Sequence, residues 1–415
     1  MTPRVVVDGG RLLGRLDELA RVTATPGRGV TREAWGPHDV AARDLVAGWM
    51  SRSGLAPEVD AAANLIGRSP GQEGRWLASG SHLDTVVHGG PLDGVYGVVA
   101  ALEAASSLHD VGHTMAHGLL VAAFANEEGA RGTAGMTGSY GCIGALDAGW
   151  LDEVDDDGVS VRQRIADAGG DPGHIAAAQW PVDQIDAFVE LHIEQGPVLD
   201  RAGARIGVVT GITGRQALDL HVVGAANHAG TTPMDLRHDA LAAAAEIVLA
   251  IEGLPRSGGI RVATCGHIGA VPNVRNVVPG DVTLGVELRD QSTAAIDAAM
   301  RELEAILDRV ADLRRVTIVK EWGQRVPPRL AATHIAASVR RAATENDLAF
   351  VELPSGAGHD AQVIAEAVPI GMIFVPSIGG LSHAPDERTE PSDLVAGAQV
   401  LLDTLLDLDR PRGER

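Results

Sequence analysis

"RWLASGSHLDTVVHGGPLDGVYGVVAALEAASSLHDVGHTMAHGLLVAAFANEEG", residues 75–129, predicts a strand, a helix and a second strand in turn. The two apolar runs at its ends are typical of buried strands, and residues 97–110 repeat their apolar side chains at helical spacing. A strand, a helix and a strand in this order favour a parallel sheet covered by helices. Residues 186–200, "DAFVELHIEQGPVLD", add another apolar strand to the same sheet.

The pattern changes near residue 212. From there the chain predicts a strand, helix, strand, strand, helix and strand at 215–224, 237–254, 260–270, 280–290, 293–313 and 314–322. This β-α-β-β-α-β order is that of a ferredoxin-like unit. After a Pro-rich return linker at 323–330 the α/β pattern resumes. We therefore expect an α/β domain formed by residues 1–212 and 329–415, with a second domain, residues 213–328, inserted into it.

Composition narrows the class of protein. Lys and Arg number 34 and Asp and Glu number 55, for a net charge of −21. This excess argues against nucleic acid or an anionic membrane as a partner. Two cysteines, Cys142 and Cys265, are too few for a disulfide framework or a thiolate metal site. The N-terminal residues lack the apolar stretch of a signal peptide, and no apolar run approaches the ~20 residues of a membrane span. We expect a soluble cytoplasmic protein.

Several metal-ligand side chains fall at predicted strand ends or in Gly-rich loops. Ligands bind at the carboxyl ends of strands in open parallel sheets. A hydrolytic two-metal site needs a shared carboxylate, further ligands for each metal and a base. His82 offers an imidazole, and Asp84 could accept its other ring N–H and fix its tautomer. Asp93, beside Gly94 and Gly97, suits a bridging carboxylate.

Glu127 and Glu128 divide the remaining roles. Adjacent side chains on extended backbone point to opposite sides, so we do not expect the two glutamates to bind the same metal ion. We assign Glu128 as a ligand and Glu127 as the general base toward an attacking water. His192 and His383 then complete one metal each. These residues alone leave two interpretations open. They form a metal site, or they are ordinary hydrogen-bonded and solvated polar groups.

The chain also resembles a known family, through nine motifs in family order over almost its whole length. They are GSHLDTV (80–86), LDGVYG (92–97), NEEG (126–129), ELHIEQGPVLD (190–200), NHAGTTPM (227–234), PNVRNVVPG (272–280), ELRD (287–290), SGAGHDA (355–361) and VPSIGGLSH (375–383). They are similar to the hydantoinase/carbamoylase amidases, which include N-carbamoyl-L-amino-acid hydrolases, β-ureidopropionases and allantoate amidohydrolases. That family belongs to the dinuclear-zinc aminoacylase and carboxypeptidase clan.

The resemblance implies a fold and a metal centre. The fold is a zinc-peptidase-like α/β domain with a mostly parallel central sheet, plus an inserted ferredoxin-like lid through which the chain forms a homodimer. The centre holds two divalent ions per subunit, with zinc expected first and manganese, cobalt or nickel also suitable. One ion takes His82, Asp93 and His192, and the other takes Asp93, Glu128 and His383, while Glu127 matches the family's catalytic base.

The resemblance also implies substrate contacts. His228 would polarise the scissile carbonyl, reaching in from the partner subunit, and Asn276 and Arg289 would hold the substrate's carboxylate. Gln195 and Gly358 fall at further substrate-binding positions. Without the resemblance, His228 and Arg289 would be interpreted as surface groups.

Two positions bear on the member of the family. His192 favours an amidase, because the peptidase branch more often has a carboxylate at that place. Gly132 stands where the family usually has an aromatic residue, which predicts a larger or looser pocket. His359 and Asp360 are expected only to shape their loop.

The predicted function is that of a metal-dependent amidohydrolase. It would cleave the linear C–N bond of an N-carbamoyl-L-amino acid to the free amino acid, CO2 and ammonia. Allantoate amidohydrolase and β-ureidopropionase are the alternatives within the family, and an aminoacylase or dipeptidase is a more distant one. A metal-free binding protein on an enzyme fold is the alternative from a different class.

Overall fold

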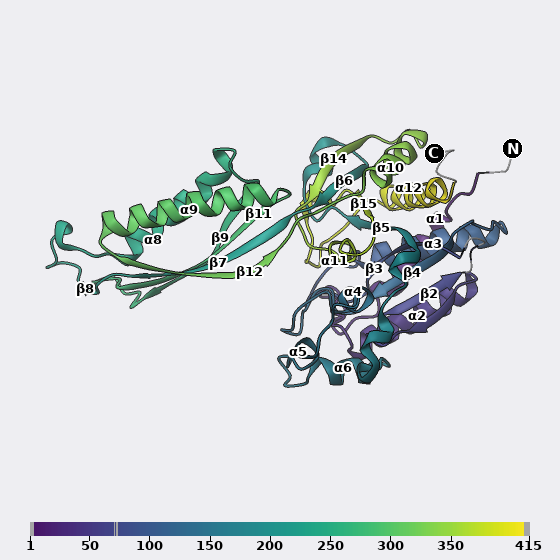
Figure 1. Cartoon of the computed structure of the whole chain (residues 1–415), viewed down its shortest axis with the longest axis horizontal. Helices are drawn as coiled ribbons and strands as arrows, with labels where there is room; N and C mark the ends of the chain where they lie inside the picture. The colour runs from purple at the N-terminus through teal and green to yellow at the C-terminus, as the bar shows by residue number, and fades with distance from the viewer. Residues whose placement is uncertain (1–3, 70, 72–73, 411–415) are drawn as a thin grey trace. The chain divides into compact units, whose positions relative to one another are not determined.

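The computed structural model describes residues 4–69, 71 and 74–410. The chain divides into two compact units (Figure 1). Unit 1 comprises the residues up to Gly211 and from Leu330 onward, and unit 2 comprises Ile212–Arg329.

Unit 1 is built on a nine-stranded mixed sheet with the order β1-β2-β4-β3-β5-β15-β6-β13, and β14 pairs with β6. Its strands are β1 Ala56–Val59, β2 Leu65–Ser69, β3 Trp76–His82, β4 Gly118–Phe124, β5 Ile185–Ile193, β6 Ile206–Ile212, β13 Arg329–Leu330, β14 Phe350–Ser355 and β15 Ile370–Val375. The central strands β4, β3, β5 and β15 are parallel, whereas β1, β2 and β6 pair antiparallel with their neighbours. The predicted mostly parallel sheet is therefore right for the centre, and the antiparallel strands make the whole sheet mixed.

Alternation along the central strands separates two faces of the sheet. Odd-numbered residues such as Leu77, Val121 and Leu191 enter the main apolar core with α1, α2, α3, α10 and α12. Successive strand residues point to opposite faces, so even-numbered residues such as His82 and His192 point to the other face. The helices α4 and α11 contact the sheet there.

Among the helices of unit 1, α3 confirms the helix predicted at residues 97–110. Their bounds are α1 Gly9–Ala20, α2 Pro37–Arg52, α3 Val95–Asp110, α4 Thr137–Cys142, α5 Ala148–Leu151, α6 Val161–Asp167, α7 Val198–Ala202, α10 Thr333–Glu345, α11 Asp360–Ile364 and α12 Pro391–Asp409, with 3-10 turns η1 Pro172–Ala178, η2 Val182–Gln184 and η4 Ile378–Gly380. Gly97 brings α3 close to the sheet, because a Cβ there would lie 2.4 Å from the carbonyl oxygen of Leu191. This close approach places the loop before α3 beside the ends of β3 and β5.

Unit 2 is a four-stranded antiparallel sheet, with the order β12-β7-β11-β9, and two long helices. The elements are β7 Gly214–Val223, β8 Asn227–His228, η3 Met234–Leu236, α8 Ala240–Arg256, β9 Val262–Val271, β10 Val277–Val278, β11 Asp281–Asp290, α9 Thr293–Arg314 and β12 Thr317–Val326. The main elements follow the predicted β-α-β-β-α-β order, and both helices share one apolar core with the sheet. The predicted return linker is wrong in part, since residues 323–326 extend β12 and Arg329–Leu330 form β13.

Within the part of the chain that the structure describes, no helix has both the length and the apolar character needed to cross a membrane.

Candidate metal centre

The parallel strands bring the predicted ligands to one edge of the sheet. His82 is the last residue of β3, Glu127 and Glu128 follow β4, and His192 lies near the end of β5. Asp93 precedes α3, next to Gly94, whose φ is 64°. A Cβ at Gly94 would lie 2.4 Å from the ring of His82, so only glycine lets this loop approach the imidazole.

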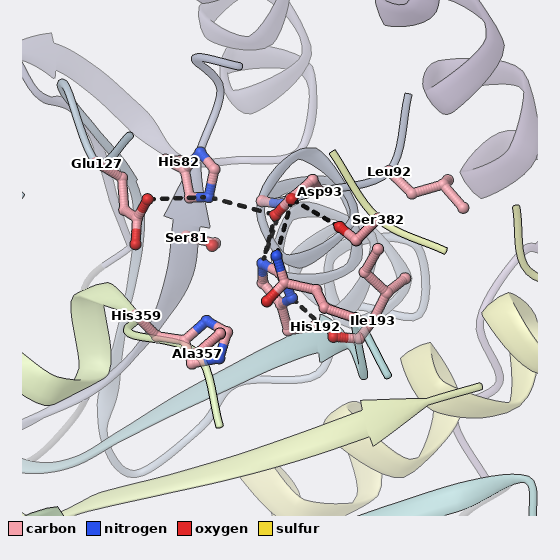
Figure 2. Close-up of polar contacts among 12 residues, drawn as sticks. Ser81, His82, Leu92, Asp93, Glu127, His192, Ile193, Ala357, His359 and Ser382 are labelled. Atoms are coloured by element: carbon pink, nitrogen blue, oxygen red, sulfur yellow. Dashed lines mark hydrogen bonds and ion pairs between the residues drawn. The ribbon is translucent and has the colours of Figure 1, made fainter. Parts of the chain in front are cut away.

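One group of ligands gathers around a single oxygen of Asp93 (Figure 2). Oδ1 of Asp93 lies 3.2 Å from Nε2 of His192 and 3.8 Å from Nε2 of His82. All three side chains are buried. Burial alone would raise the pKa of Asp93, but its hydrogen bonds to His192 and His383 hold that pKa well below its usual range.

A second group gathers around the other oxygen. Oδ2 of Asp93 lies 3.0 Å from Nε2 of His383, and Oε2 of Glu128 lies 3.6 Å from the same nitrogen. Oε1 of Glu128 is buried and, among the described residues, has no hydrogen-bond partner. Burial and the nearby charge of Asp93 raise the pKa of Glu128 to about 8. The two oxygens of Asp93 thus face two different groups of potential ligands.

Glu127 lies beside one member of each group, since it forms a third set of close ligand atoms with His82 and Glu128. Its Oε2 is 3.9 Å from Nε2 of His82. Burial, together with the charge of Glu128, raises the pKa of Glu127 well above its usual range. A carboxyl group with a raised pKa is suited to exchange protons near neutral pH.

The donor set fits two divalent cations. Imidazole nitrogens and carboxylate oxygens suit zinc, manganese, cobalt and nickel. Buried carboxylates this close repel one another, and bound cations would neutralise them. The partnerless Oε1 of Glu128 is the kind of buried acceptor that a cation would satisfy. Two groups of three ligand atoms, each within 4.8 Å of one another, share Asp93.

Comparison with known proteins identifies the family of this chain. The sequence model of peptidase family M20/M25/M40 matches residues 71–407. The chain belongs to this family. It is also 39% identical over 405 residues to an N-carbamoyl-L-amino acid amidohydrolase of Geobacillus stearothermophilus, covering 97% of this chain and 99% of that one. An allantoate amidohydrolase of Bacillus subtilis is 35% identical, with 95% and 96% covered.

Solved structures place this M20 chain among the hydantoinase/carbamoylase amidases. The crystal structure of such an amidase from Burkholderia multivorans superposes with a TM-score of 0.91 at 34% identity, and 98% of each chain is covered. The resemblance inferred from the motifs is therefore confirmed, as is the class of enzyme, an amidohydrolase.

Asp84 contacts His82 differently from the expectation. The main-chain carbonyl oxygen of Asp84, rather than its carboxylate, lies 2.9 Å from Nδ1 of His82, whereas Oδ1 is 3.8 Å away. The carboxylate instead accepts the main-chain N–H groups of Glu127 and Glu128, each at 3.2 Å. Burial raises the pKa of Asp84 to about 6. The spacing of two residues predicted the contact but not which oxygen makes it.

The other predicted substrate residues of unit 1 lie near this M20 centre. Gln195 has a positive φ of 59°, and its Nε2 donates to Oδ2 of Asp93 at 2.9 Å. Gly358 follows β14, and a Cβ there would lie 2.8 Å from Cε of Met136. Gly358 therefore adjoins the loop that leaves Glu127 and Glu128.

In unit 2, His228 and Asn276 are neighbours. His228 lies on β8, which pairs with β10, and the carbonyl of Asn276 accepts the N–H of Ala229 at 2.9 Å. Arg289 lies near the end of β11 and donates to Glu287. Arg289 lies eight residues after Asp281, where β11 begins, so a strand rise of about 3.4 Å per residue separates these two residues by about 27 Å. The structure thus does not bring Asn276 and Arg289 of one chain together, as the joint assignment to one carboxylate had implied.

Gly132 lies in the exposed part of the loop after the two glutamates. Its φ is 83°, and a Cβ there would lie 2.5 Å from Oδ1 of Asp156. A side chain at this position would therefore require the backbone or Asp156 to shift. The larger pocket inferred from the missing aromatic ring stays a prediction.

Several buried residues around the centre escaped the sequence analysis. Glu190 accepts hydrogen bonds from Ser81 and from the main chain of Ala361. His359 was assigned only to its loop, yet its ring packs edge-on against that of His192, with centroids 4.6 Å apart. The polar residue Glu190 within an apolar strand was the available signal. Two residues near His383 in the sequence, Ser382 and Glu387, also lie beside Asp93.

Proposed function

We propose that this chain is a homodimeric dinuclear metal amidohydrolase that converts an N-carbamoyl-L-amino acid to the amino acid, CO2 and ammonia. The observation that carries the proposal is the position of Asp93, whose two oxygens face His82 with His192 on one side and Glu128 with His383 on the other. A single carboxylate shared by two ligand groups is the arrangement of a two-metal hydrolase. The similarity to N-carbamoyl-L-amino acid amidohydrolases supports the substrate class.

Two bound divalent ions would supply Lewis-acid chemistry, polarising the reacting carbonyl and lowering the pKa of water. Glu127 accepts the proton of the attacking water, because its carboxylate lies beside both ligand groups without being needed by either. The same carboxyl then returns the proton to the departing nitrogen. Asp84 fixes the position of Glu127 through the main-chain hydrogen bond to its N–H.

Five further residues are assigned to substrate recognition. We assign Arg289 to the substrate's carboxylate, because a guanidinium pairs bidentately with such a group. We assign Asn276 to the same substrate and His228 to the developing oxyanion. Gln195 and Gly358 complete the contacts. The length of β11 supports contributions from two subunits, since the two ends of one strand cannot both reach one small molecule.

We infer that unit 2 corresponds to a ferredoxin-like lid and dimerisation domain, residues 213–328, and that residues 1–212 and 329–415 form the catalytic domain. The element order of unit 2 supports the assignment. A cytoplasmic location stays a prediction of the sequence.

Allantoate is the second candidate substrate, because curated relatives that act on it are 35% identical to this chain. The deciding experiment measures ammonia release by protein reconstituted with zinc, manganese, cobalt or nickel. N-carbamoyl-L-amino acids, N-carbamoyl-β-alanine and allantoate are compared at equal concentrations. Turnover of N-carbamoyl-L-amino acids above the other two supports the proposal. Preference for allantoate or N-carbamoyl-β-alanine assigns the chain to the corresponding alternative, and turnover of none, with two ions per chain verified, refutes the carbamoyl substrate.

A further inference from the structure

His383 differs from the other four predicted ligands in how it is held. Its side chain is 48% exposed, whereas those of His82, Asp93, Glu128 and His192 are at most 6% exposed. Its backbone φ is 54°, in the left-handed region that is strained for a residue other than glycine. A strained residue in an exposed loop keeps its position only when neighbouring contacts hold it there.

Glu387, four residues after His383, supplies such contacts. Its side chain is buried, and Oε1 accepts the main-chain N–H groups of Leu92 and Asp93 at 2.9 and 3.1 Å. Gly90 makes room for it, since a Cβ at Gly90 would lie 2.1 Å from the same oxygen. Glu387 therefore ties the loop that carries His383 to the loop that carries the shared carboxylate.

Ser382, the residue before His383, makes the second tie (Figure 2). Its hydroxyl lies 3.0 Å from Oδ2 of Asp93. The same hydroxyl lies 2.9 Å from Oε2 of Glu387. Oδ2 is the oxygen of Asp93 that faces His383. The hydroxyl of Ser382 thus orients the carboxylate of Asp93 toward His383, the residue that follows Ser382 in the chain.

We propose that Glu387 and Ser382 are positioning residues for the ion held by Asp93, Glu128 and His383. The inference rests on the proposed metal centre but not on the substrate. Removing either anchor frees the loop that carries His383, and loss of the Ser382 hydroxyl also removes one contact of Oδ2 of Asp93. Oδ1 of Asp93, which faces the other ligand group, keeps its contact with His192. Partners that orient metal ligands in this way typically contribute 10–100-fold to metal affinity.

The test measures both dissociation constants for zinc by competition with a chromophoric chelator. Glu387→Ala and Ser382→Ala should each weaken the affinity for the ion of the Asp93, Glu128 and His383 group by about 10–100-fold. The affinity for the ion of the His82, Asp93 and His192 group should fall by less than about threefold. Glu387→Gln should restore affinity to within about threefold, because an amide oxygen still accepts both N–H groups while its NH2 reaches Ser382. His383→Ala identifies the affected ion, since it should lose the same one.

Two buried residues remote from the centre serve as matched controls. Glu103 accepts the N–H of Asp8 and pairs with Arg11, and Ser106 bonds Ser53. Glu103→Ala and Ser106→Ala should lower the Tm without changing either dissociation constant.

Unchanged affinities in both Ser382→Ala and Glu387→Ala, equal weakening of both ions, or an equal effect in Glu103→Ala would overturn the inference. If Glu387→Ala does not fold, Ser382→Ala still decides, with Ser106→Ala as its control. Failure of the wild-type protein to bind two ions would instead refute the metal centre itself.

Discussion

The carboxylate of Asp84 holds the main chain of Glu127, with Oδ1 3.2 Å from its nitrogen. Its second oxygen holds the N–H of Glu128, and its own carbonyl oxygen contacts His82. Asp84 therefore joins the loop after β3 to the loop after β4 through two hydrogen bonds, and its third contact fixes the ring of His82 at the end of β3. The proposed base and two proposed ligands depend on that connection.

Asp84→Asn should lower turnover by about 10- to 100-fold. The amide keeps one acceptor oxygen but turns a donor toward the second N–H, and a buried unpaired N–H costs about 1–3 kcal/mol. The contact to His82 should survive because it comes from the main chain. The measurement is kcat and metal content of the reconstituted variant.

Asp409→Asn is the matched control for this substitution. Asp409 accepts the N–H groups of Ala116 and His117 just before β4, as Asp84 accepts those of Glu127 and Glu128 after it. The control should lose stability and keep its kcat. An equal fall of kcat in both variants would mean that Asp84 acts only through the stability of the fold.

Glu127→Gln should lower kcat by about 10²–10⁴-fold, the usual contribution of a general acid–base group. The fold and both ions should remain, because Glu127 completes neither ligand group that shares Asp93. Turnover and metal stoichiometry are measured on the same preparation.

Glu128→Gln is the comparison for the adjacent position, and it should lose one ion. Loss of an ion in Glu127→Gln with retention of both in Glu128→Gln would exchange the two assigned roles.

Mixed dimers of His228→Ala and Arg289→Ala should regain activity that neither variant has alone. If each site takes Arg289 from one chain and His228 from the other, a heterodimer contains one intact site. A statistical mixture should then show about a quarter of the wild-type activity. The two variants are co-expressed with different tags, and ammonia release is measured on the purified heterodimer and on the mixture.

Absence of complementation would contradict the shared site. Either His228 and Arg289 would then act in the site of the same subunit, or one of them would not belong to the site. The separately purified variants provide the baseline for this comparison.

His117 should stabilise the fold more at pH 5.5 than at pH 8. Its Nδ1 and Nε2 lie 2.9 Å from carboxylate oxygens of Asp409 and Asp186, and only the protonated ring donates at both nitrogens. The hydrogen bond with Asp409, followed by that with Asp186, raises the pKa of His117. Removing the imidazole ring and its two hydrogen bonds in His117→Ala should lower the free energy of unfolding by about 2 kcal/mol at the lower pH.

The direction of this pH dependence follows from the raised pKa of His117. Stability from a raised histidine pKa is fully present below the unfolded value of about 6.5 and is lost as the pH rises through the folded value. Arg75 and then His117 lower the pKa of Asp186 to about 2, so its contribution persists down to about pH 4. Denaturant unfolding between pH 4 and 8 measures the difference, and His174→Ala, at an exposed pair with Asp171, should show none. A difference that grows with pH would contradict the assignment.

The sequence was most informative where a pattern is local. The strand ending at His82, the helix that begins at Val95 and the strand ending at Phe124 follow from apolar periodicity bounded by glycine-rich loops. It was less informative for β1, β2 and β6, whose direction depends on the neighbour with which each strand pairs. The Pro-rich stretch at 323–330 was interpreted as a linker, but pairing with β7 extends β12 into it.

The sequence by itself determined the types of side chain available at the centre, the family, and the alternation that directs His82 and His192 to one face of the sheet. Only the tertiary structure decided which atoms meet. Leu92 and Glu387 are 295 positions apart and share a hydrogen bond, and the carbonyl of Asp84 replaces its carboxylate beside His82. Periodicity reports which face of an element is buried, whereas a contact of about 3 Å depends on how remote loops pack together.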